Sequence, residues 1–493
     1  MSQKLAVDAG AVERIKAGYL PGLSDDEVQW QVLPFEARDG LRLEVCVPML
    51  TAPQMRELAE RVRKAADAHL RSMPVAEIIE AIDRAMARLL DRNDVYRQLA
   101  ERWLPVVSGY DVDMVRLGLT GFFKTFRAAQ LKRFVAEDFS NPAVLDSFQP
   151  AAKGGAVRAF GPDLLVHSWA GNVPALSLWS LVCGLLVKAP AMGKLASAEP
   201  LFAGWFARLL AEVHPSLADC LAVVWWRGAG GEEADALYAQ ADTVLAYGGN
   251  STLDALRRRL PVTTRFLPHG HKLGFGLIAA QALDTLKAPA MARLAAWDVM
   301  RYDQQGCYSP HVFYVQRGGA VSPRAFADYL AAELANLQRR FARRELDLEE
   351  GAAVARWQQS MEWSTEPQQL LGPVDAAWSV AYSDGLQPLM PTALQRTIVV
   401  VAVDSLDDVL PVVAAQRDYL QTAGIAASPE ELYRLAGLLG AAGVTRISAI
   451  GSMSMPEAGW HHDGRFNLLD LVRMTEIEQS AELAAQPLAV YAD

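Results

Sequence analysis

One cysteine in this chain has a setting that suits a nucleophile. Cys307 follows Gly306 and precedes the strand-like run HVFYV. A glycine there lets the backbone approach a substrate closely, and a thiolate readily forms acyl and hemithioacetal adducts. Most cysteines, however, behave as small buried apolar side chains. Taken alone, Cys307 is better explained as a core residue, so its chemistry depends on what surrounds it.

An asparagine upstream could complement such a nucleophile. Asn172 follows Gly171 and precedes Val173 and Pro174. Its amide could donate to the oxyanion that forms when a cysteine attacks a carbonyl. It could equally cap a helix that has Pro174 in its first turn. The two roles are compatible, because a helix N-terminus also favours developing negative charge.

Two segments suit a ligand that carries ribose or phosphate. Lys194 ends a strand-like run, and small residues and Pro200 follow it. It could bind ribose or phosphate, or it could simply be solvated. In AYGGNST a strand turns into a helix, with Asn250 or Ser251 as the expected cap, and such an N-terminus is an anion site. The turn is not a GxGxxG motif, so it is a weak signal by itself.

Four histidines lie in two further segments. His269 and His271 belong to LPHGHKLG, and His461 and His462 are adjacent. The first two could act as acids or bases, although such histidines are more often structural. The chain lacks the ligand spacing of a zinc site around the second pair, so no metal is predicted.

These residues must be positioned by alternating strands and helices. Apolar residues recur at helical spacing from Ala52 to about Leu131. Strand-like and helix-like runs then alternate through DLLVHSWA, VPALSLWSLVCG, LLVKAPA, LFAGWFARLLAEV, LAVVWW, EEADALYAQA, TVLAYGG and STLDALRRRL. A second α/β region begins near Pro268 and includes a helix near MARLAAWDVMRYD, helices in residues 323–350, and the strands HVFYV, TIVVVAV and GVTRISAI. The pattern predicts an α/β fold with a doubly wound, mostly parallel sheet.

Composition narrows the function classes. The chain has 493 residues, enough for two or three domains, and a net charge of −10 that disfavours nucleic-acid binding. The uncharged run at residues 172–187 is shorter than a membrane span and contains Pro174. The N-terminal residues have no apolar core of a secretory signal. The four cysteines are far apart, which indicates reduced thiols and a cytoplasmic protein.

The order of five segments carries a family resemblance. WAGNVP, GKLASAEP, AYGGNST, LPHGHKLG and QQGCYSPHVFYV, in this order, resemble the aldehyde dehydrogenase superfamily. PEAGWHHDGRFNLLDLVRM, together with GNVPALSLWSLVCGLL, is similar to LuxC-type acyl-CoA reductases, the fatty acid reductases of bacterial bioluminescence operons and their relatives. The resemblance covers roughly residues 150–475. It implies a nicotinamide-cofactor domain over 1–267, a catalytic domain over 268–455, and oligomerisation segments at 140–160 and 474–493.

The resemblance also implies roles for single residues. Cys307 matches the catalytic nucleophile and Asn172 matches the oxyanion-hole asparagine. Lys194 matches the lysine that binds the adenosine ribose. The turn at Gly249 and Asn250 matches the one that helps to hold the pyrophosphate. Gly270 is placed with the cofactor-binding residues, as is Ser197.

Two departures from the superfamily pattern refine the expected chemistry. Hydrolytic members carry a glutamate base where this chain has Pro268, which cannot accept a proton. An acyl-enzyme would then survive to meet hydride or another thiol. Ser197 stands where NAD-selective members commonly have a glutamate. A serine does not repel a 2′-phosphate, which favours NADPH, with NADH still possible.

The resemblance implies that the chain reduces an acyl thioester, a long-chain fatty acyl-CoA, to the aldehyde through an acyl-cysteine. Three alternatives stay open: action on short-chain or aromatic acyl groups, a cysteine-dependent acyl transfer without redox, and a non-catalytic subunit. The acyl donor could also be a carrier protein or an acyl-activating partner enzyme. The family implies a homodimer or homotetramer.

Overall fold

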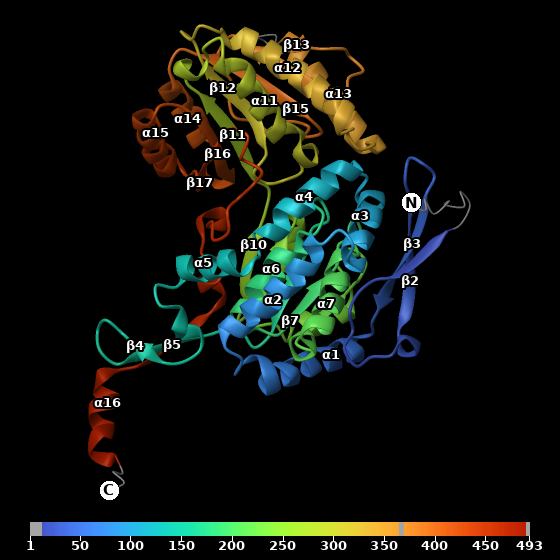
Figure 1. The fold of residues 1–493 in the computed structure, drawn as a ribbon, viewed down its shortest axis with the longest axis vertical. Helices are drawn as coiled ribbons and strands as arrows, with labels where there is room; N and C mark the ends of the chain where they lie inside the picture. The colour runs from blue at the N-terminus through green and yellow to red at the C-terminus, as the bar shows by residue number, and fades with distance from the viewer. Residues whose placement is uncertain (1–11, 364–368, 490–493) are drawn as a thin grey trace.

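The chain forms two α/β lobes and a small projecting arm (Figure 1). The computed structural model describes residues 12–363 and 369–489. The chain up to about residue 270 builds the lower lobe in Figure 1, and residues from 273 to 450 build the upper one. The arm joins residues 149–160 to the C-terminal segment.

A five-stranded parallel sheet forms the centre of the lower lobe. Its strands are β6 (Leu165–Ser168), β7 (Ala191–Lys194), β8 (Leu221–Val224), β9 (Thr243–Tyr247) and β10 (Arg265–His269). They are ordered β10-β9-β6-β7-β8. The chain therefore leaves the β8 edge and returns to place β9 beside β6. Such a switch point opens a crevice at the carboxyl ends of the strands, where α/β sheets bind ligands. The predicted doubly wound parallel sheet is confirmed.

Helices cover both faces of this sheet. Along β6, Leu165 joins one apolar core and Val166 joins the other, as the alternation of a strand requires. The Leu165 face packs against α6 (Ser177–Leu186) and α7 (Phe202–Val213), with the short α8 (Pro215–Ala218) following. The Val166 face packs against α1 (Ala52–Ala65), α9 (Glu232–Tyr238) and α10 (Asn250–Arg257).

The run LLVKAPA is not the strand that was predicted. Helix α6 continues through Leu186, the chain turns at Lys188 with φ of +60°, and β7 begins only at Ala191. All ten residues of α6 are buried. A helix that is apolar on every face has no periodicity to mark its end, so the helix and the strand were not separable by pattern. Among the described residues, no helix is both long and apolar enough to cross a membrane.

The helical segment predicted from Ala52 to about Leu131 is confirmed. It comprises α1, then α2 (Val75–Leu90), α3 (Val95–Ser108), α4 (Val112–Lys124) and α5 (Ala128–Asp138). A three-stranded sheet precedes it, ordered β1-β3-β2. Its strands are β1 (Glu13–Lys16), β2 (Gln29–Glu36) and β3 (Arg42–Met49), for which no prediction was made.

The upper lobe is built on a seven-stranded sheet ordered β13-β14-β15-β12-β11-β16-β17. Its strands are β11 (Leu273–Ile278), β12 (Pro310–Gln316), β13 (Gln369–Leu371), β14 (Ser379–Ser383), β15 (Thr397–Val403), β16 (Leu420–Ala426) and β17 (Arg446–Ala449). The helices are α11 (Lys287–Met300), α12 (Pro323–Arg340), α13 (Leu348–Glu362), α14 (Val409–Ala414) and α15 (Pro429–Ala442). The strands predicted from HVFYV, TIVVVAV and GVTRISAI are confirmed as β12, β15 and β17.

The arm contains both segments that were predicted to mediate oligomerisation. Strand β18 (Arg473–Ile477) pairs antiparallel with β5 (Ala156–Phe160) of the same chain, and β5 pairs with β4 (Gln149–Pro150). Helix α16 (Gln479–Ala485) extends beyond them (Figure 1). Four of the five β18 residues are exposed. Contact with another copy stays a prediction, and residues 490–493 lie outside the described chain.

Candidate active site

Cys307 lies on a turn with an unusual backbone between α11 and β12. Just before it, Tyr302, Asp303 and Gln304 have φ of +48°, +49° and +64°. Residues other than glycine seldom adopt this left-handed conformation, and each strained position costs about 1–3 kcal/mol. The surrounding structure must therefore hold the turn in place.

Asp303 anchors this turn. Its Oδ1 accepts a hydrogen bond from Arg396 Nε at 2.7 Å, and its Oδ2 accepts one from the backbone N–H of Arg344 at 3.1 Å. The side chains of Asp303 and Arg396 are only 1% and 2% exposed. The backbone N–H of Gln395 donates to the Asp303 carbonyl at 2.9 Å. Leu394, Gln395 and Arg396 also have positive φ, so two left-handed segments brace each other beside the nucleophile.

Three other parts of the chain converge on the Cys307 turn. Gln421, in β16, donates from Nε2 to Cys307 Sγ at 3.4 Å. His462 Nε2 lies 4.0 Å from the same sulfur. Asn172, in the turn before α6, donates from Nδ2 to the backbone carbonyl of Gln305 at 2.6 Å. Asn172 and Cys307, paired by the resemblance, thus lie in one site.

The structure separates the two roles weighed for Asn172. Helix α6 begins at Ser177 with Leu176 at its N-cap, so Asn172 does not have the capping role that was weighed as an alternative. The turn is held instead by Tyr110, whose hydroxyl donates to the Asn172 carbonyl at 2.7 Å. A side-chain amide has two donor hydrogens. The bond to Gln305 uses one and leaves the other to donate to a substrate oxygen.

The Cys307 thiol is half-buried by surface area, yet protein atoms pack closely around it. Burial raises the pKa of the thiol to about 11; the hydrogen bond from Gln421 opposes this shift, and the charge of Asp463 adds to it. Cys307 is therefore protonated at neutral pH. Because the thiolate is the attacking form, the thiol must lose its proton during the reaction.

Asp463 links the groups around the thiol. Its Oδ2 accepts from His269 Nδ1 at 2.8 Å, and its Oδ1 accepts from Gln421 Nε2 at 2.7 Å. Burial alone would favour the neutral acid, but the His269 hydrogen bond and the nearby His462 ring hold the pKa of Asp463 well below its usual range. Asp463 is thus a buried carboxylate with a partner on each oxygen, and its own φ is +55°.

The rings of His269 and His462 stack face to face. Their centroids are 4.2 Å apart and their planes differ by 9°. The ring of Trp460 also contacts the His462 ring, with centroids 4.7 Å apart. One ligand atom each from His269, His462 and Asp463 fall within 4.8 Å of one another. Imidazole lone pairs lie in the ring planes, however, and parallel planes one above the other do not converge on one ion. The geometry favours proton chemistry over metal binding.

The remaining histidines lie apart from the thiol. His461 is exposed and contacts Phe466 edge-on at 5.0 Å. His271 is exposed and stands over Gly249, where an added methyl would lie 3.1 Å from His271 Nε2. The sequence had left the roles of these histidines open. The sequence analysis assigned no role to Gln421 or Asp463. Asp463 was included only as part of the segment PEAGWHHDGRFNLLDLVRM, which carries the family resemblance.

The expected cofactor residues gather at the carboxyl edge of the lower sheet. Lys194 ends β7, the Gly249–Asn250 turn joins β9 to α10, and Gly270 follows β10. Gly249 is the N-cap of α10 and no side chain caps the helix, so the predicted cap by Asn250 or Ser251 is wrong. The first-turn N–H groups are then available to an anion. Gly270 permits a close approach, since a methyl there would meet Asn250 Oδ1 at 2.8 Å.

Lys194 and Ser197 border this edge. Burial lowers the pKa of Lys194, and no ion pair to it occurs within residues 12–363 and 369–489. Ser197 Oγ accepts a hydrogen bond from Trp225 Nε1 at 3.1 Å. A lysine without an ion-pair partner and an uncapped helix N-terminus, both at this edge of the sheet, match what a dinucleotide presents, namely ribose hydroxyls and phosphates. The residues present fit a nicotinamide dinucleotide.

The Asn172 turn packs directly on the Lys194 segment. A methyl at Gly171 would lie 2.8 Å from Ala198 Cβ and 2.9 Å from the backbone nitrogen of Glu199. Glu199 is buried, and its Oε1 accepts from the backbone N–H groups at the start of α7, both at 2.9 Å. The two motifs are therefore one packed unit that joins the cofactor edge to the nucleophile.

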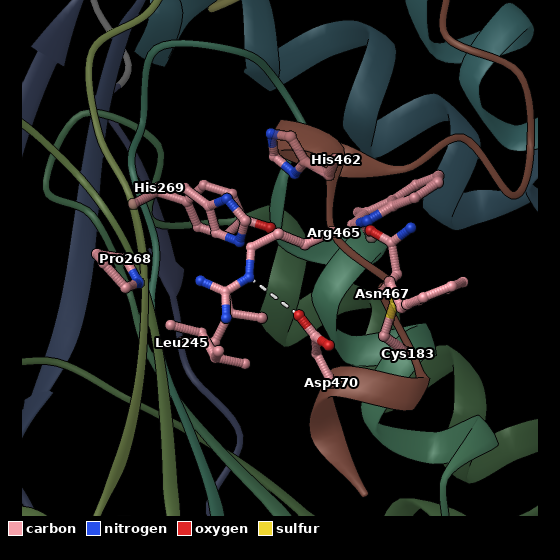
Figure 2. A pocket seen from close by; sticks show the side chains of 12 residues that line it. Cys183, Leu245, Pro268, His269, His462, Arg465, Asn467 and Asp470 are labelled. Atoms are coloured by element: carbon pink, nitrogen blue, oxygen red, sulfur yellow. Dashed lines mark hydrogen bonds and ion pairs between the residues drawn. The ribbon is translucent and has the colours of Figure 1, made fainter. Parts of the chain in front are cut away.

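A small pocket adjoins the two stacked histidines (Figure 2). It lies on the α6 side of the lower sheet, against the segment 462–470. His269 and His462 line one part, and an ion pair between Arg465 and Asp470 (2.9 Å) crosses another. The other lining residues are mostly apolar or aromatic: Trp179, Cys183, Leu245, Tyr247, Leu267, Pro268, Phe466 and Asn467.

Comparison with known proteins places the chain among acyl reductases. Residues 70–474 match the family model described as acyl-CoA reductase (LuxC). The chain is 26% identical over 411 residues to a long-chain acyl-protein thioester reductase of Photorhabdus luminescens, covering 81% of this chain and 82% of the relative. It is 24% identical over 339 residues to one from Vibrio harveyi, covering 68% of each.

Solved structures show the same fold at low sequence identity. Aldehyde dehydrogenase 21 from Physcomitrella patens matches with a TM-score of 0.72 at 13% identity, over 95% of this chain and 99% of that one. Aldehyde dehydrogenase KauB from Pseudomonas aeruginosa matches with a TM-score of 0.73 at 14% identity, over 94% and 96%. The chain has the aldehyde dehydrogenase fold, as its sequence pattern predicted.

The anchoring of the nucleophile turn can be tested through Asp303. Asp303→Asn keeps the shape of the side chain but leaves the buried Arg396 guanidinium without its counter-charge. We expect a loss of about 3–5 kcal/mol in the free energy of unfolding, measured by urea denaturation. The matched control is Asp328→Asn, which breaks an exposed pair with Arg324 (3.3 Å) and should change stability by less than about 1 kcal/mol. Equal losses in the two variants would contradict the anchoring role.

Proposed function

The chain belongs to the LuxC family of acyl-CoA reductases and is an NAD(P)H-dependent oxidoreductase, and from that premise we propose that it reduces a long-chain fatty acyl-CoA to the aldehyde through an acyl-cysteine at Cys307. The observation that carries this proposal is the convergence on one turn of a half-buried thiol, the Asn172 amide and the neutral His462 ring. These are the groups that acyl transfer to a thiol requires: a nucleophile, an oxyanion donor and a proton acceptor.

In the proposed reaction, Cys307 is the nucleophile and the Asn172 amide is an oxyanion donor. Cys307 Sγ attacks the thioester carbon, and the oxyanion accepts hydrogen bonds from the Asn172 amide and the Cys307 backbone N–H. The CoA thiolate leaves and the acyl group stays on Cys307. The reduced nicotinamide, when bound, supplies the hydride to the acyl carbonyl. Cys307 then leaves the thiohemiacetal carbon, which releases the aldehyde.

Reduction is favoured over hydrolysis by what stands beside the acyl group. Pro268 occupies the place where hydrolytic relatives in the superfamily have a glutamate base, and it cannot activate water. Asp463, the carboxylate whose charge acts on the thiol among the described residues, has both oxygens engaged by His269 and Gln421. Neither residue provides a free carboxylate for water, so the acyl-enzyme persists until hydride arrives.

The long-chain substrate is proposed on two grounds. The relatives from Photorhabdus luminescens and Vibrio harveyi are named long-chain acyl-protein thioester reductases. The pocket beside His462 offers apolar surface from Leu245, Leu267 and Phe466 to an acyl chain. A carrier protein or an acyl-activating partner enzyme could present the same acyl group, since the thioester carbon is the reacting atom in each case.

A fatty acyl-CoA and NADPH test the proposed activity and the nucleophile together. The wild-type chain should oxidise NADPH as aldehyde forms, and Cys307→Ala should show neither aldehyde nor covalent acyl labelling. Cys46→Ala, which removes a buried thiol in β3, is the control and should retain both. Labelling that persists in Cys307→Ala would refute the assignment. Acyl transfer without NADPH oxidation in the wild type would support a transferase instead.

The oxyanion role of Asn172 has a kinetic signature. Asn172→Ala removes the amide that links to the nucleophile turn, and acylation by fatty acyl-CoA should slow by on the order of a hundredfold or more. Rapid quenching followed by intact-mass measurement of the acyl-enzyme gives this rate. A near-normal rate would leave the amide with only its bond to Gln305.

We propose NADPH as the preferred cofactor because Ser197 places no carboxylate near a 2′-phosphate. Ser197→Glu should therefore raise the KM for NADPH more than that for NADH, because the new charge repels the phosphate. Ser197→Gln, similar in size but neutral, separates charge from bulk. An unchanged ratio of the two KM values in Ser197→Glu would remove the basis for this preference.

A further inference from the structure

We propose that His462 is the acid-base residue of the reaction, taking the proton of the Cys307 thiol as the sulfur attacks and returning it to the departing thiolate. This assignment rests on the proposed function and concerns a residue to which the family resemblance gave no defined role. His462 is set by geometry: its Nε2 faces Cys307 Sγ at 4.0 Å, the nearest ring nitrogen described for that sulfur.

The ring of His462 packs against two other aromatic rings. His269 stacks on it with centroids 4.2 Å apart, and Trp460 packs at 4.7 Å with a tilt of 34°. These ring contacts limit rotation of the imidazole and keep Nε2 directed at the sulfur. His269 is itself fixed by its hydrogen bond to Asp463, so the carboxylate positions the base through a second ring.

The charges around His462 keep it neutral before the reaction and support it afterwards. Burial, then the neighbouring His269, lowers the pKa of His462 well below its usual range, so the ring is neutral at pH 7. In the tautomer with its proton on Nδ1, Nε2 offers a lone pair to the thiol. The other titratable groups that face it are Lys272, Tyr247 and Cys307, with Arg465 and Asp470 across the pocket. Asp463 Oδ2 lies 3.9 Å from Nε2 and stabilises the imidazolium as it forms.

The proton balance closes over one cycle. The S–H bond of Cys307 breaks as its proton moves to His462 Nε2 and the S–C bond to the acyl carbon forms. The CoA thiolate departs and takes the proton from His462 as a free thiol. After hydride transfer, the thiohemiacetal oxyanion collapses to the aldehyde and the Cys307 thiolate leaves. One solvent proton, delivered through His462, then restores the thiol.

The distance between His462 and the thiol suits direct proton transfer. A water that bridges two groups needs hydrogen-bonding distance to each, about 3 Å on either side. The 4.0 Å separation of Nε2 from Sγ is too short to hold a water between them. The proton therefore passes directly from sulfur to nitrogen.

The test compares the pH dependence of Cys307 acylation in wild type and His462→Gln. Glutamine keeps polarity and approximate size but cannot carry a proton between groups. Fatty acyl-CoA without cofactor is the acyl donor, and mass spectrometry follows the adduct from pH 6 to 9.5. In the wild type both partners start neutral, so the rate should stay flat up to about pH 8, above which direct reaction of the thiolate adds to it. In His462→Gln only the thiolate reacts; its pKa near 11 predicts a tenfold gain per pH unit, from a rate at pH 7 on the order of a hundredfold below wild type.

Two controls separate proton transfer from a structural role. His461→Gln alters the adjacent, exposed histidine and should keep the flat profile. His462→Ala should regain acylation when free imidazole is added. A wild-type rate in His462→Gln, or a slow rate with an unchanged pH profile and no rescue by imidazole, would overturn the proposal.

Iodoacetamide alkylation of Cys307 gives the same comparison without any acyl thioester. If fatty acyl-CoA fails to acylate the wild type, the proposed function fails. The alkylation profile still reports on His462: a flat wild-type profile against a steep one in His462→Gln supports proton transfer, and identical profiles contradict it.

Discussion

The buried ion pair between Asp303 and Arg396 is the interaction on which the site depends. Both side chains are almost fully enclosed, and the pair lies where two left-handed backbone segments meet. Without a counter-charge, either group would impose a large desolvation cost. The pair therefore fixes the turn in one conformation, and that turn carries Cys307 to the place where Asn172, Gln421 and His462 reach it.

The environment of Cys307 keeps the nucleophile in its protonated, unreactive form. Burial raises the pKa of its thiol to about 11, so little thiolate exists at neutral pH. A protonated thiol is less open to oxidation than a thiolate, and it reacts when a base and an electrophile are both present. The stacked histidines and Asp463 form such a base beside the sulfur, and Lys194 and the α10 N-terminus lie at the cofactor edge of the same lobe. The nucleophile and the cofactor edge are linked through the packed unit of Gly171 and Glu199.

Sequence alone predicted the fold class well because strand and helix periods are local properties. The alternating runs from 163 to 260 became β6 to α10 with one clear exception. Buried helix α6 ran past its predicted end because it is apolar on every side. Helix caps were also misplaced at Asn172 and Asn250, since capping depends on where a turn closes and not on residue type alone.

The site itself was only partly visible in sequence. Cys307 and Asn172 were found through the order of short segments, and the structure brings them together. Gln421 and Asp463 were missed because their roles exist only after β16 and the 462–464 turn approach the Cys307 loop. The importance of Asp303 was equally hidden, since its partner Arg396 lies on a distant segment of the upper lobe.

Trapping the acyl-enzyme tests the central claim most directly. Wild-type protein would be mixed with a fatty acyl-CoA in the absence of cofactor, digested, and mapped by mass spectrometry, while a parallel sample receives NADPH before digestion. The account predicts an acyl group on the peptide that contains Cys307, and its loss on NADPH addition with an equal amount of fatty aldehyde formed. An acyl group on any other residue, or an adduct at Cys307 that NADPH does not convert to aldehyde, would contradict it.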